Sequence, residues 1–150
     1  MAEFDWTERK PPGHYINRIT RAMARIADQR LKKLGFASAQ LPVLTSLKGG
    51  KKLTQRELAV LAKVEQPTMA QLLSRMERDG LVRREPDPTD GRSSLLSLTK
   101  TAVSRLPEGR AVLHKMNNEA LRGLSKAEVE MFLLFLQRVL ENIETAEKDL

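Results

Sequence analysis

Apolar residues recur at three- and four-residue steps along most of this chain, which is the spacing of one face of an α-helix. The pattern changes between residues 81 and 98, where two short β-type segments, 81–85 and 93–98, flank a loop rich in proline, aspartate and glycine. A further short strand is expected at Lys52-Leu53. The expected helices are 14–34, 38–47, 54–62, 66–79, 101–122 and 125–147. The pattern therefore predicts a mainly α fold with a small β-hairpin.

The middle of the chain has the clearest helix boundaries. Thr54 and Glu57 have capping-box spacing, in which each side chain binds a free backbone N–H at the helix start. Pro67 is tolerated in the first turn of the next helix, and Gly80 accepts the left-handed conformation on which helices end. Two helices with a short link, followed by a hairpin, predict a winged helix-turn-helix over residues 51–99. The second helix of such a motif is shaped to enter a major groove of DNA.

The segments before this motif are expected to be an irregular arm and two helices. Residues 1–13 are expected to stay irregular because a Pro-Pro-Gly run interrupts a helix. Gly35 ends the 14–34 helix, and Ser38 is expected to cap the helix that follows.

The segments after the motif are expected to be two long helices. Pro107 and Gly109 predict a kink or a late start in the first of them. Ser125 and Glu128 form a second capping box before the last helix. The apolar face of that last helix consists of Val129, Phe132, Leu133, Leu136, Val139, Leu140 and Ile143.

The apolar stripes of the first and last helices leave two interpretations open. The helices cover one another within one chain, or they pack against a second copy. We favour a two-fold homodimer in which 14–34 and 101–147 are dimerisation helices. Such a dimer would place two recognition helices about 34–36 Å apart, which is one turn of DNA.

Charge adds a candidate partner to this picture. The 150 residues are enough for one domain, and 26 Lys and Arg against 19 Asp and Glu give a net charge of +7. The excess lies in residues 1–35 and 48–92, whereas residues 93–150 are balanced. A basic balance favours a polyanion such as double-stranded DNA, although charge alone leaves an inert basic surface equally open.

Several other classes of function are not expected. The chain has no cysteine, which excludes disulfides, cysteine-based zinc sites and thiol switches. His14 and His114 are far apart in sequence and have no metal-ligand cluster or phosphate loop beside them, so we expect no enzyme, no cofactor and no metal. No signal peptide or long apolar run is present, so we expect a cytoplasmic protein without membrane association. A helical module that binds protein instead of DNA is the remaining alternative, and the salt dependence of DNA binding separates the two.

The expected DNA contacts gather at the starts of the two middle helices and on the hairpin. Gln66 and Gln71 can each pair with adenine, and Met69 can pack against a thymine methyl. The alternative is that Gln66 only caps the helix and Gln71 only faces solvent. The full set of expected DNA-binding residues is Thr54, Gln55, Gln66, Pro67, Thr68, Met69, Gln71, Arg75, Arg84, Asp90 and Arg92. Leu58, Leu61, Val64, Leu72, Leu73 and Met76 are expected to pack inside the motif.

Arg92 has two interpretations on the hairpin tip. Its guanidinium can enter a narrow A·T minor groove, where the negative potential is deepest. It can equally form a structural salt bridge with Asp90, two positions earlier. Arg83 and Arg84, on the first strand, are further candidates for phosphate contacts.

The hairpin carries residues that resemble a known family. Asp90, Arg92, Leu98 and Thr99 match the D-x-R-x5-L-T wing signature of the MarR/SlyA family of bacterial transcription regulators, and Glu65-Gln66-Pro67-Thr68 is similar to the start of the recognition helix in the SlyA branch. The resemblance covers nearly the whole chain. It implies an obligate winged-helix homodimer that binds pseudo-palindromic promoter DNA.

The chain departs from the family pattern at three positions. Gly91 stands where many relatives have a second wing arginine, Gln71 stands where the SlyA branch tends to have arginine, and Ala102 replaces a frequent glycine.

The resemblance also implies a small aromatic acid or phenolic effector between the dimerisation helices and the winged lobe. His14, Tyr15 and Arg18 are the candidate ligand residues, because an arginine beside aromatic side chains can hold an aromatic carboxylate. The alternative is that His14 and Tyr15 only anchor the start of the first helix.

Overall fold

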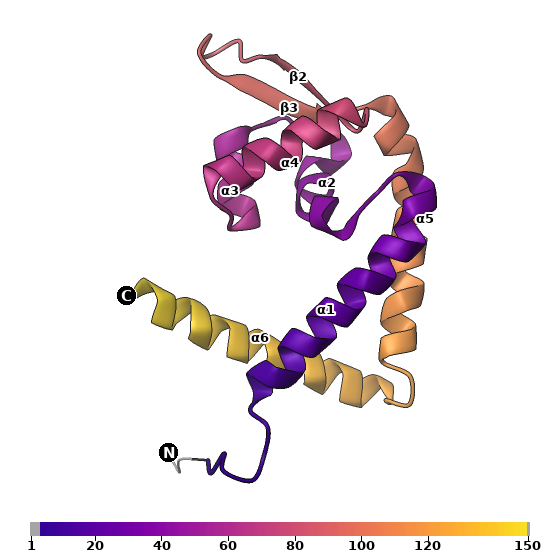
Figure 1. Ribbon diagram of the computed structural model, residues 1–150, viewed down its shortest axis with the longest axis vertical. Coiled ribbons are helices and arrows are strands. Elements are labelled where there is room, and N and C mark those ends of the chain that lie inside the picture. Colours follow the sequence, from indigo (N-terminus) through magenta and orange to yellow (C-terminus); the bar gives the residue numbers. More distant parts are fainter. Residues whose placement is uncertain (1–3, 150) are drawn as a thin grey trace. The chain divides into compact units, whose positions relative to one another are not determined.

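The computed structural model describes residues 4–149 (Figure 1). Its elements are α1 (Pro12–Leu31), η1 (Lys32–Leu34), η2 (Ser38–Gln40), α2 (Leu41–Leu47), η3 (Lys48–Gly50), β1 (Leu53–Thr54), α3 (Gln55–Ala62), α4 (Gln66–Arg78), β2 (Val82–Pro86), β3 (Ser94–Leu98), α5 (Lys100–Ala120) and α6 (Lys126–Lys148), where η denotes a 3-10 helix. The chain divides into two compact units, Met1–His114 and Lys115–Leu150. The predicted fold class, mainly helical with a small β wing, is confirmed. No described helix is both long and apolar enough to cross a membrane.

The winged lobe is built from α2, α3, α4 and a three-stranded sheet. The strands are antiparallel in the order β1-β3-β2, so the short strand predicted beside the hairpin is present. The helices gather on one side of the sheet, and the β2–β3 hairpin extends past α4 (Figure 1). The fully buried side chains of the lobe include Leu47, Leu58, Met69, Leu73, Met76, Leu81 and Leu96.

Local hydrogen bonds explain where the hairpin begins and ends. Gly80 has a φ of 71° after α4, which allows the chain to turn into β2. The Thr99 hydroxyl donates to the Gly80 carbonyl at 2.6 Å and accepts the Ala102 N–H at 3.1 Å. Thr99 therefore joins the base of the hairpin to the start of α5.

The start of α1 corrects one prediction. Pro11 is the N-cap residue and Pro12 is the first helical residue, so the proline run starts the helix that it was expected to interrupt. The physical reason is that a first-turn proline lacks only an N–H that would have no helical partner.

Ser38 corrects a second prediction, because it is not a helix cap. Its N–H donates to Asp28 Oδ1 at 2.6 Å, and this hydrogen bond lowers the pKa of Asp28. Ala37 is the N-cap residue instead, and its N–H donates to Gln40 Oε1 at 2.9 Å.

The fifth helix is continuous from Lys100 through Pro107, so the late start is wrong. Gly109 is explained by packing: a Cβ atom there would lie 3.3 Å from two ring carbons of Phe36. The glycine therefore allows the close approach of α5 to Phe36, and it does not weaken the helix start.

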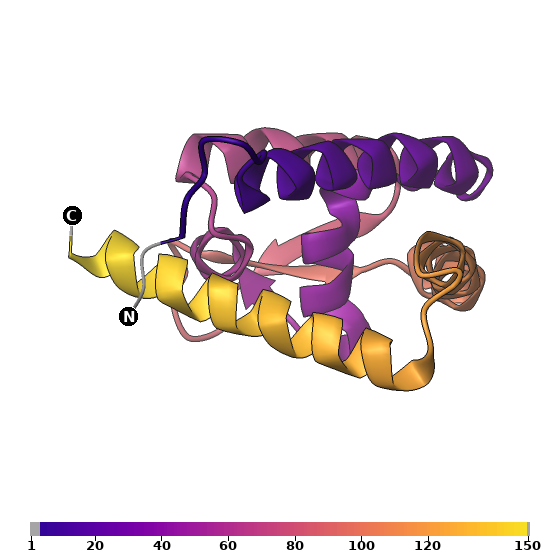
Figure 2. The same cartoon turned by 90° about the horizontal axis from the view of Figure 1, so that it is seen from below.

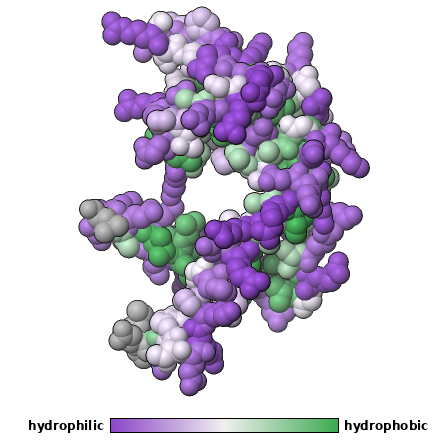
Figure 3. Space-filling view, in the orientation of Figure 1, coloured by the Kyte–Doolittle hydropathy of each residue, from purple (hydrophilic) through white to green (hydrophobic). Residues whose placement is uncertain are grey.

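The second unit contains α6, which Figure 2 shows as one uninterrupted helix. The predicted capping box is confirmed, with Ser125 accepting the Glu128 N–H at 3.3 Å and Glu128 accepting the Ser125 N–H at 2.7 Å. None of the α6 residues that the structure describes is buried. Apolar surface over α6 is visible in Figure 3. The exposed apolar residues of α6 are Met131, Phe132, Leu133, Leu134, Phe135, Leu136, Val139, Leu140 and Ile143.

Candidate nucleic-acid interface

The N-termini of α3 and α4 lie side by side. Gln55 is the first residue of α3 and Gln66 is the first residue of α4, and Gln55 Nε2 donates to Gln66 Oε1 at 3.2 Å. Each helix start presents backbone N–H groups without helical partners and the positive end of a helix dipole. Two such starts together form a surface that favours phosphate oxygens.

The side chain of Thr54 shapes one of these helix starts. Its hydroxyl oxygen accepts the Glu57 N–H at 3.2 Å and donates to Glu57 Oε2 at 2.9 Å. The predicted capping box is therefore confirmed. Because the hydroxyl is already engaged, Thr54 contributes to an interface mainly by holding the α3 N-terminus in place.

The exposed side of α4 presents polar and basic side chains. Gln66, Pro67, Thr68, Gln71 and Arg75 are all exposed. Gln71 and Arg75 are four residues apart and thus lie on the same face of the helix. Bases and phosphates can both be reached from this face, because an amide can pair with a base edge and a guanidinium can pair with a phosphate.

Met69 does not belong to this exposed side. Its exposed fraction is 0%, and Leu73 and Met76, four and seven positions later, are equally buried. These three side chains form the inward face of α4, so Met69 cannot reach a thymine methyl, and that prediction is wrong. Leu61 and Val64 show the opposite error, because they were expected in the core and are 60% and 38% exposed.

The tip of the hairpin is shaped by its own hydrogen bonds. Asp90 Oδ1 accepts the backbone N–H of Arg92 at 3.0 Å, and the Ser93 N–H donates to the Asp90 carbonyl at 2.9 Å. Within residues 4–149 the structure records no ion pair of the Arg92 guanidinium. Asp90 thus braces the backbone of the loop, which leaves the exposed Arg92 side chain available to a ligand.

Arg84 has partners that the sequence did not predict. Its Nε donates to Glu77 Oε1 at 3.0 Å, and its Nη1 donates to Ser94 Oγ at 2.9 Å. The side chains of Arg84 and Glu77 are 35% and 31% exposed. The guanidinium therefore joins α4 to both strands of the wing.

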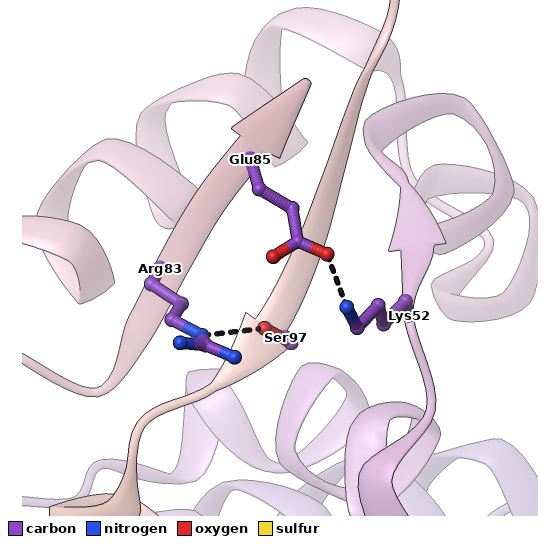
Figure 4. A network of polar contacts seen from close by, with 4 residues as sticks. All are labelled: Lys52, Arg83, Glu85 and Ser97. Atoms are coloured by element: carbon purple, nitrogen blue, oxygen red, sulfur yellow. Dashed lines mark hydrogen bonds and ion pairs between the residues drawn. The ribbon is translucent and has the colours of Figure 1, made fainter. Parts of the chain in front are cut away.

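A second polar network lies across the strands, as Figure 4 shows. Lys52 forms an ion pair with Glu85, and Arg83 Nε donates to Ser97 Oγ at 3.2 Å. The hydrogen bond from Lys52 is the main reason that the pKa of Glu85 lies below its ordinary value. The chain before β1 is thereby tied to β2, on the far side of β3.

Two hollows among the described residues of the first unit are candidates for a ligand site. The larger, about 570 Å³, is lined by the predicted ligand residues His14, Tyr15 and Arg18 together with Phe4 and Trp6. His14 Nε2 is buried and has no hydrogen-bond partner in the described chain, and the His14 and Tyr15 rings meet edge to face with centroids 5.4 Å apart. All residues that line this hollow lie between 4 and 18, so the winged lobe takes no part in it.

The smaller hollow, about 150 Å³, was missed by the sequence reasoning. It is lined by side chains of α1, α2 and α5, among them Leu31, Leu44 and Arg110, and by Phe36 between η1 and η2. Gly109 also lines it, and a glycine inside a helical pattern was the one available signal.

Comparison with known proteins places this geometry in a family. The sequence model of the MarR family matches residues 34–93, which include α2, α3, α4 and β2. A variant of E. coli MarR, solved in complex with operator DNA, is 25% identical and has a TM-score of 0.80, covering 92% of this chain and 99% of that one. The PcaV transcriptional regulator from Streptomyces coelicolor, solved with its natural ligand, is 28% identical with a TM-score of 0.74, covering 94% and 98%.

The transcriptional regulator SlyA has the same fold, with a TM-score of 0.82 at 24% identity over 91% of this chain and 96% of that one. The fold similarity thus extends over the helices on both sides of the winged lobe as well as the lobe itself. Residues 34–93 thus match the sequence model of the MarR family, and the chain has the winged-helix fold of the MarR and SlyA transcription regulators.

Proposed function

We propose that this protein is a sequence-specific, DNA-binding transcription regulator. The observation that carries the proposal is the pairing of the α3 and α4 N-termini through Gln55 and Gln66, beside the exposed Gln71 and Arg75 of α4. The helix starts suit backbone phosphates, and the amides suit base edges in a major groove. The E. coli MarR relative was solved with operator DNA, which supports the same role here.

The wing is proposed to make a separate contact in the minor groove. Arg92 is exposed on a loop that Asp90 shapes through its backbone. A free guanidinium on such a loop suits the negative potential of a narrow A·T minor groove.

We propose a homodimer as the DNA-binding form, with pseudo-palindromic sites. Two helices support it: α6 has no buried residue among those described, and α1 leaves Ile16, Ile19 and Ile26 exposed. Apolar helix faces of this length are usually covered in a stable protein, and a second copy would cover them.

Two steps test this function. Duplexes that bind the protein are first selected from a random library, and a selected and a random duplex are then titrated at two salt concentrations. We expect the selected duplex to contain two related half-sites and to bind at least about 10³-fold more tightly than the random one. Arg92→Ala should weaken binding and reduce the salt slope by about one, whereas Arg25→Ala, an exposed arginine on α1, should not. Equal binding of both duplexes would contradict sequence-specific recognition.

We also propose that a small aromatic acid relieves DNA binding. The hollow beside His14, Tyr15 and Arg18 offers a guanidinium for the carboxylate, aromatic walls for the ring, and the unpartnered His14 Nε2. A relative solved with its natural ligand, PcaV, supports a ligand in this fold. The alternative remains that His14 and Tyr15 only anchor the start of α1.

Titration of salicylate against the free and the DNA-bound protein tests this switch. If salicylate lowers DNA affinity, DNA must lower salicylate affinity by the same factor. Arg18→Ala should abolish the effect if the acid occupies the larger hollow, and Arg110→Ala should abolish it if the acid occupies the smaller one. Equal salicylate affinity in both states would exclude an aromatic-acid switch.

A further inference from the structure

Three polar side chains connect the recognition helix to the wing. Arg84 on β2 donates to Glu77 Oε1 of α4 at 3.0 Å and to Ser94 Oγ of β3 at 2.9 Å. We call Glu77, Arg84 and Ser94 the wing clamp. A guanidinium has several N–H groups in one rigid plane, so a single arginine can hold two partners at a defined angle.

The wing clamp lies farther from the base of the hairpin than the hydrogen bonds of Thr99. The base of the hairpin is held by Thr99, which bonds to the Gly80 carbonyl. The hydrogen bonds of the tip, in contrast, run between Asp87 and Ser93 and between Asp90 and Arg92, within the hairpin itself. They shape the tip but do not orient it relative to α4.

The two polar networks of the sheet belong to opposite faces. Arg84 is paired with the buried Leu96 in the β2–β3 register, while Arg83 is paired with Ser97. Successive residues of a strand point to opposite faces, so Arg84 points toward α4 and Arg83 points away from it. The Lys52–Glu85 pair joins the chain before β1 to β2, whereas the wing clamp joins the sheet to the recognition helix.

We infer that the wing clamp sets the angle between the wing and α4, so that the major-groove and minor-groove contacts form together. Arg84 is then a positioning residue that acts through Glu77 and Ser94, and it is not a phosphate ligand. The effect of the wing clamp on DNA binding rests on the proposed function, but the orientation of the wing can be measured without DNA.

Substitution of Glu77 distinguishes a positioning role of the wing clamp from a purely electrostatic role, because the two roles predict opposite changes in DNA affinity. Glu77→Ala removes a negative charge near the DNA, so electrostatics alone predicts tighter binding to every duplex. Loss of the wing clamp predicts weaker binding to the selected duplex, because Arg92 is no longer held in position. Asp79→Ala removes the same charge at the same end of α4, where Asp79 pairs with Arg78 at 3.6 Å and, within residues 4–149, has no recorded side-chain hydrogen bond or ion pair to the wing.

The first measurement uses the protein without DNA. The native chain has no cysteine, so Ser74→Cys on α4 and Gly91→Cys at the hairpin tip can carry a pair of spin labels. Gly91 has open space around its Cα, so the new side chain causes no clash. Dilution with an excess of unlabelled protein restricts the dipolar signal to pairs within one chain. We expect the distance distribution to broaden in Glu77→Ala and to keep its width in Asp79→Ala.

The second measurement uses the selected duplex and a random duplex. Glu77→Ala should lower affinity for the selected duplex by about tenfold, and Arg92→Ala should then cause little further loss in that background. Arg84→Lys keeps the charge but cannot hold both partners, so it should behave like Glu77→Ala. Asp79→Ala should bind the selected duplex at least as tightly as the native protein. Thermal unfolding of every variant identifies any general loss of stability.

Three results would overturn the inference. These are an unchanged distance distribution in Glu77→Ala, unchanged or tighter binding of Glu77→Ala to the selected duplex, and full retention of the Arg92→Ala effect in the Glu77→Ala background. If the native protein binds no duplex, the proposed function fails, and the distance distributions alone then decide whether the wing clamp orients the wing.

Discussion

On α4, neighbouring positions have opposite environments. Gln71 and Arg75 are exposed, whereas Met69 and Leu73 are fully buried. Each residue of a helix is rotated by about 100° from the last, so residues two positions apart point to nearly opposite sides. This rotation decides which side chains of the proposed recognition helix can reach DNA and which hold the helix against the lobe.

Gln71→Ala should reduce binding to a selected duplex by roughly 1–3 kcal/mol and leave binding to a random duplex almost unchanged. The reason is that a glutamine amide can read a base edge but contributes little to phosphate attraction. Fluorescence anisotropy on both duplexes measures the difference, with Gln29→Ala on α1 as the matched control. A similar loss on both duplexes would show that Gln71 does not read a base.

At the scale of elements, α5 contains an unfavourable residue. Pro107 is exposed inside the helix, where it lacks the N–H that would complete a backbone hydrogen bond. Pro107→Ala should raise the free energy of unfolding by about 1–2 kcal/mol, because an interior proline costs about 3 kcal/mol and its stiffening of the unfolded chain offsets only part of that. Chemical denaturation measures the change, with Glu108→Ala as control. An unchanged midpoint would mean that the proline is compensated elsewhere.

The stability of the folded protein should depend on pH through the Lys52–Glu85 ion pair. Because Lys52 lowers the pKa of Glu85 below its ordinary value of 4.5, the ionised carboxylate stabilises the folded state. That contribution is complete above the ordinary pKa and is lost as the pH falls through the lowered one.

Glu85→Gln should therefore lower the melting temperature at pH 6 to 7, with a difference from the native protein that shrinks as the pH falls below 4.5. Thermal unfolding between pH 3 and 7 gives this difference. In a Lys52→Ala background the difference should depend on pH much less, because only the weaker attraction of Arg83 to the Glu85 carboxylate remains. If the difference between the native protein and Glu85→Gln is the same at pH 3 as at pH 7, the ion pair does not contribute to stability.

At the scale of the whole molecule, the distribution of charge agrees with the proposal that one part of the chain binds DNA and another forms the dimer. The basic excess lies in the first segment and the winged lobe, and the neutral last third contains α6. A helix of 23 residues without a buried residue has little reason to be stable alone, since most helical stability in proteins comes from a packed face.

Leu136→Asp should therefore break the homodimer or unfold the chain, because it places a charge in the middle of the apolar face of α6. Light scattering after size-exclusion chromatography gives the mass, and circular dichroism reports folding. Gln137→Asp introduces the same charge at the next position, which is polar and bonded to Glu141 at 3.1 Å, and should leave the dimer intact. A native protein that is a folded monomer at all concentrations would disprove the dimer.

The sequence by itself determined the elements whose causes are local. The capping boxes at Thr54 and Ser125, the glycine after α4 and the turn residues of the wing each act within a few positions, so their outcome could be predicted. The proline run before α1 misled the prediction because the same local signal both interrupts and starts helices.

Only the tertiary structure decided which partners those elements meet. Met69 turned inward because α4 packs against the lobe, Gly109 was needed because Phe36 lies against it, and Arg84 joined Glu77 because the hairpin folds back beside α4. These contacts depend on where separate segments of the chain come together, and periodicity within one segment holds no information about its neighbours. The sequence therefore determined the parts of a DNA-reading lobe, and tertiary packing determined which side chains are free to read.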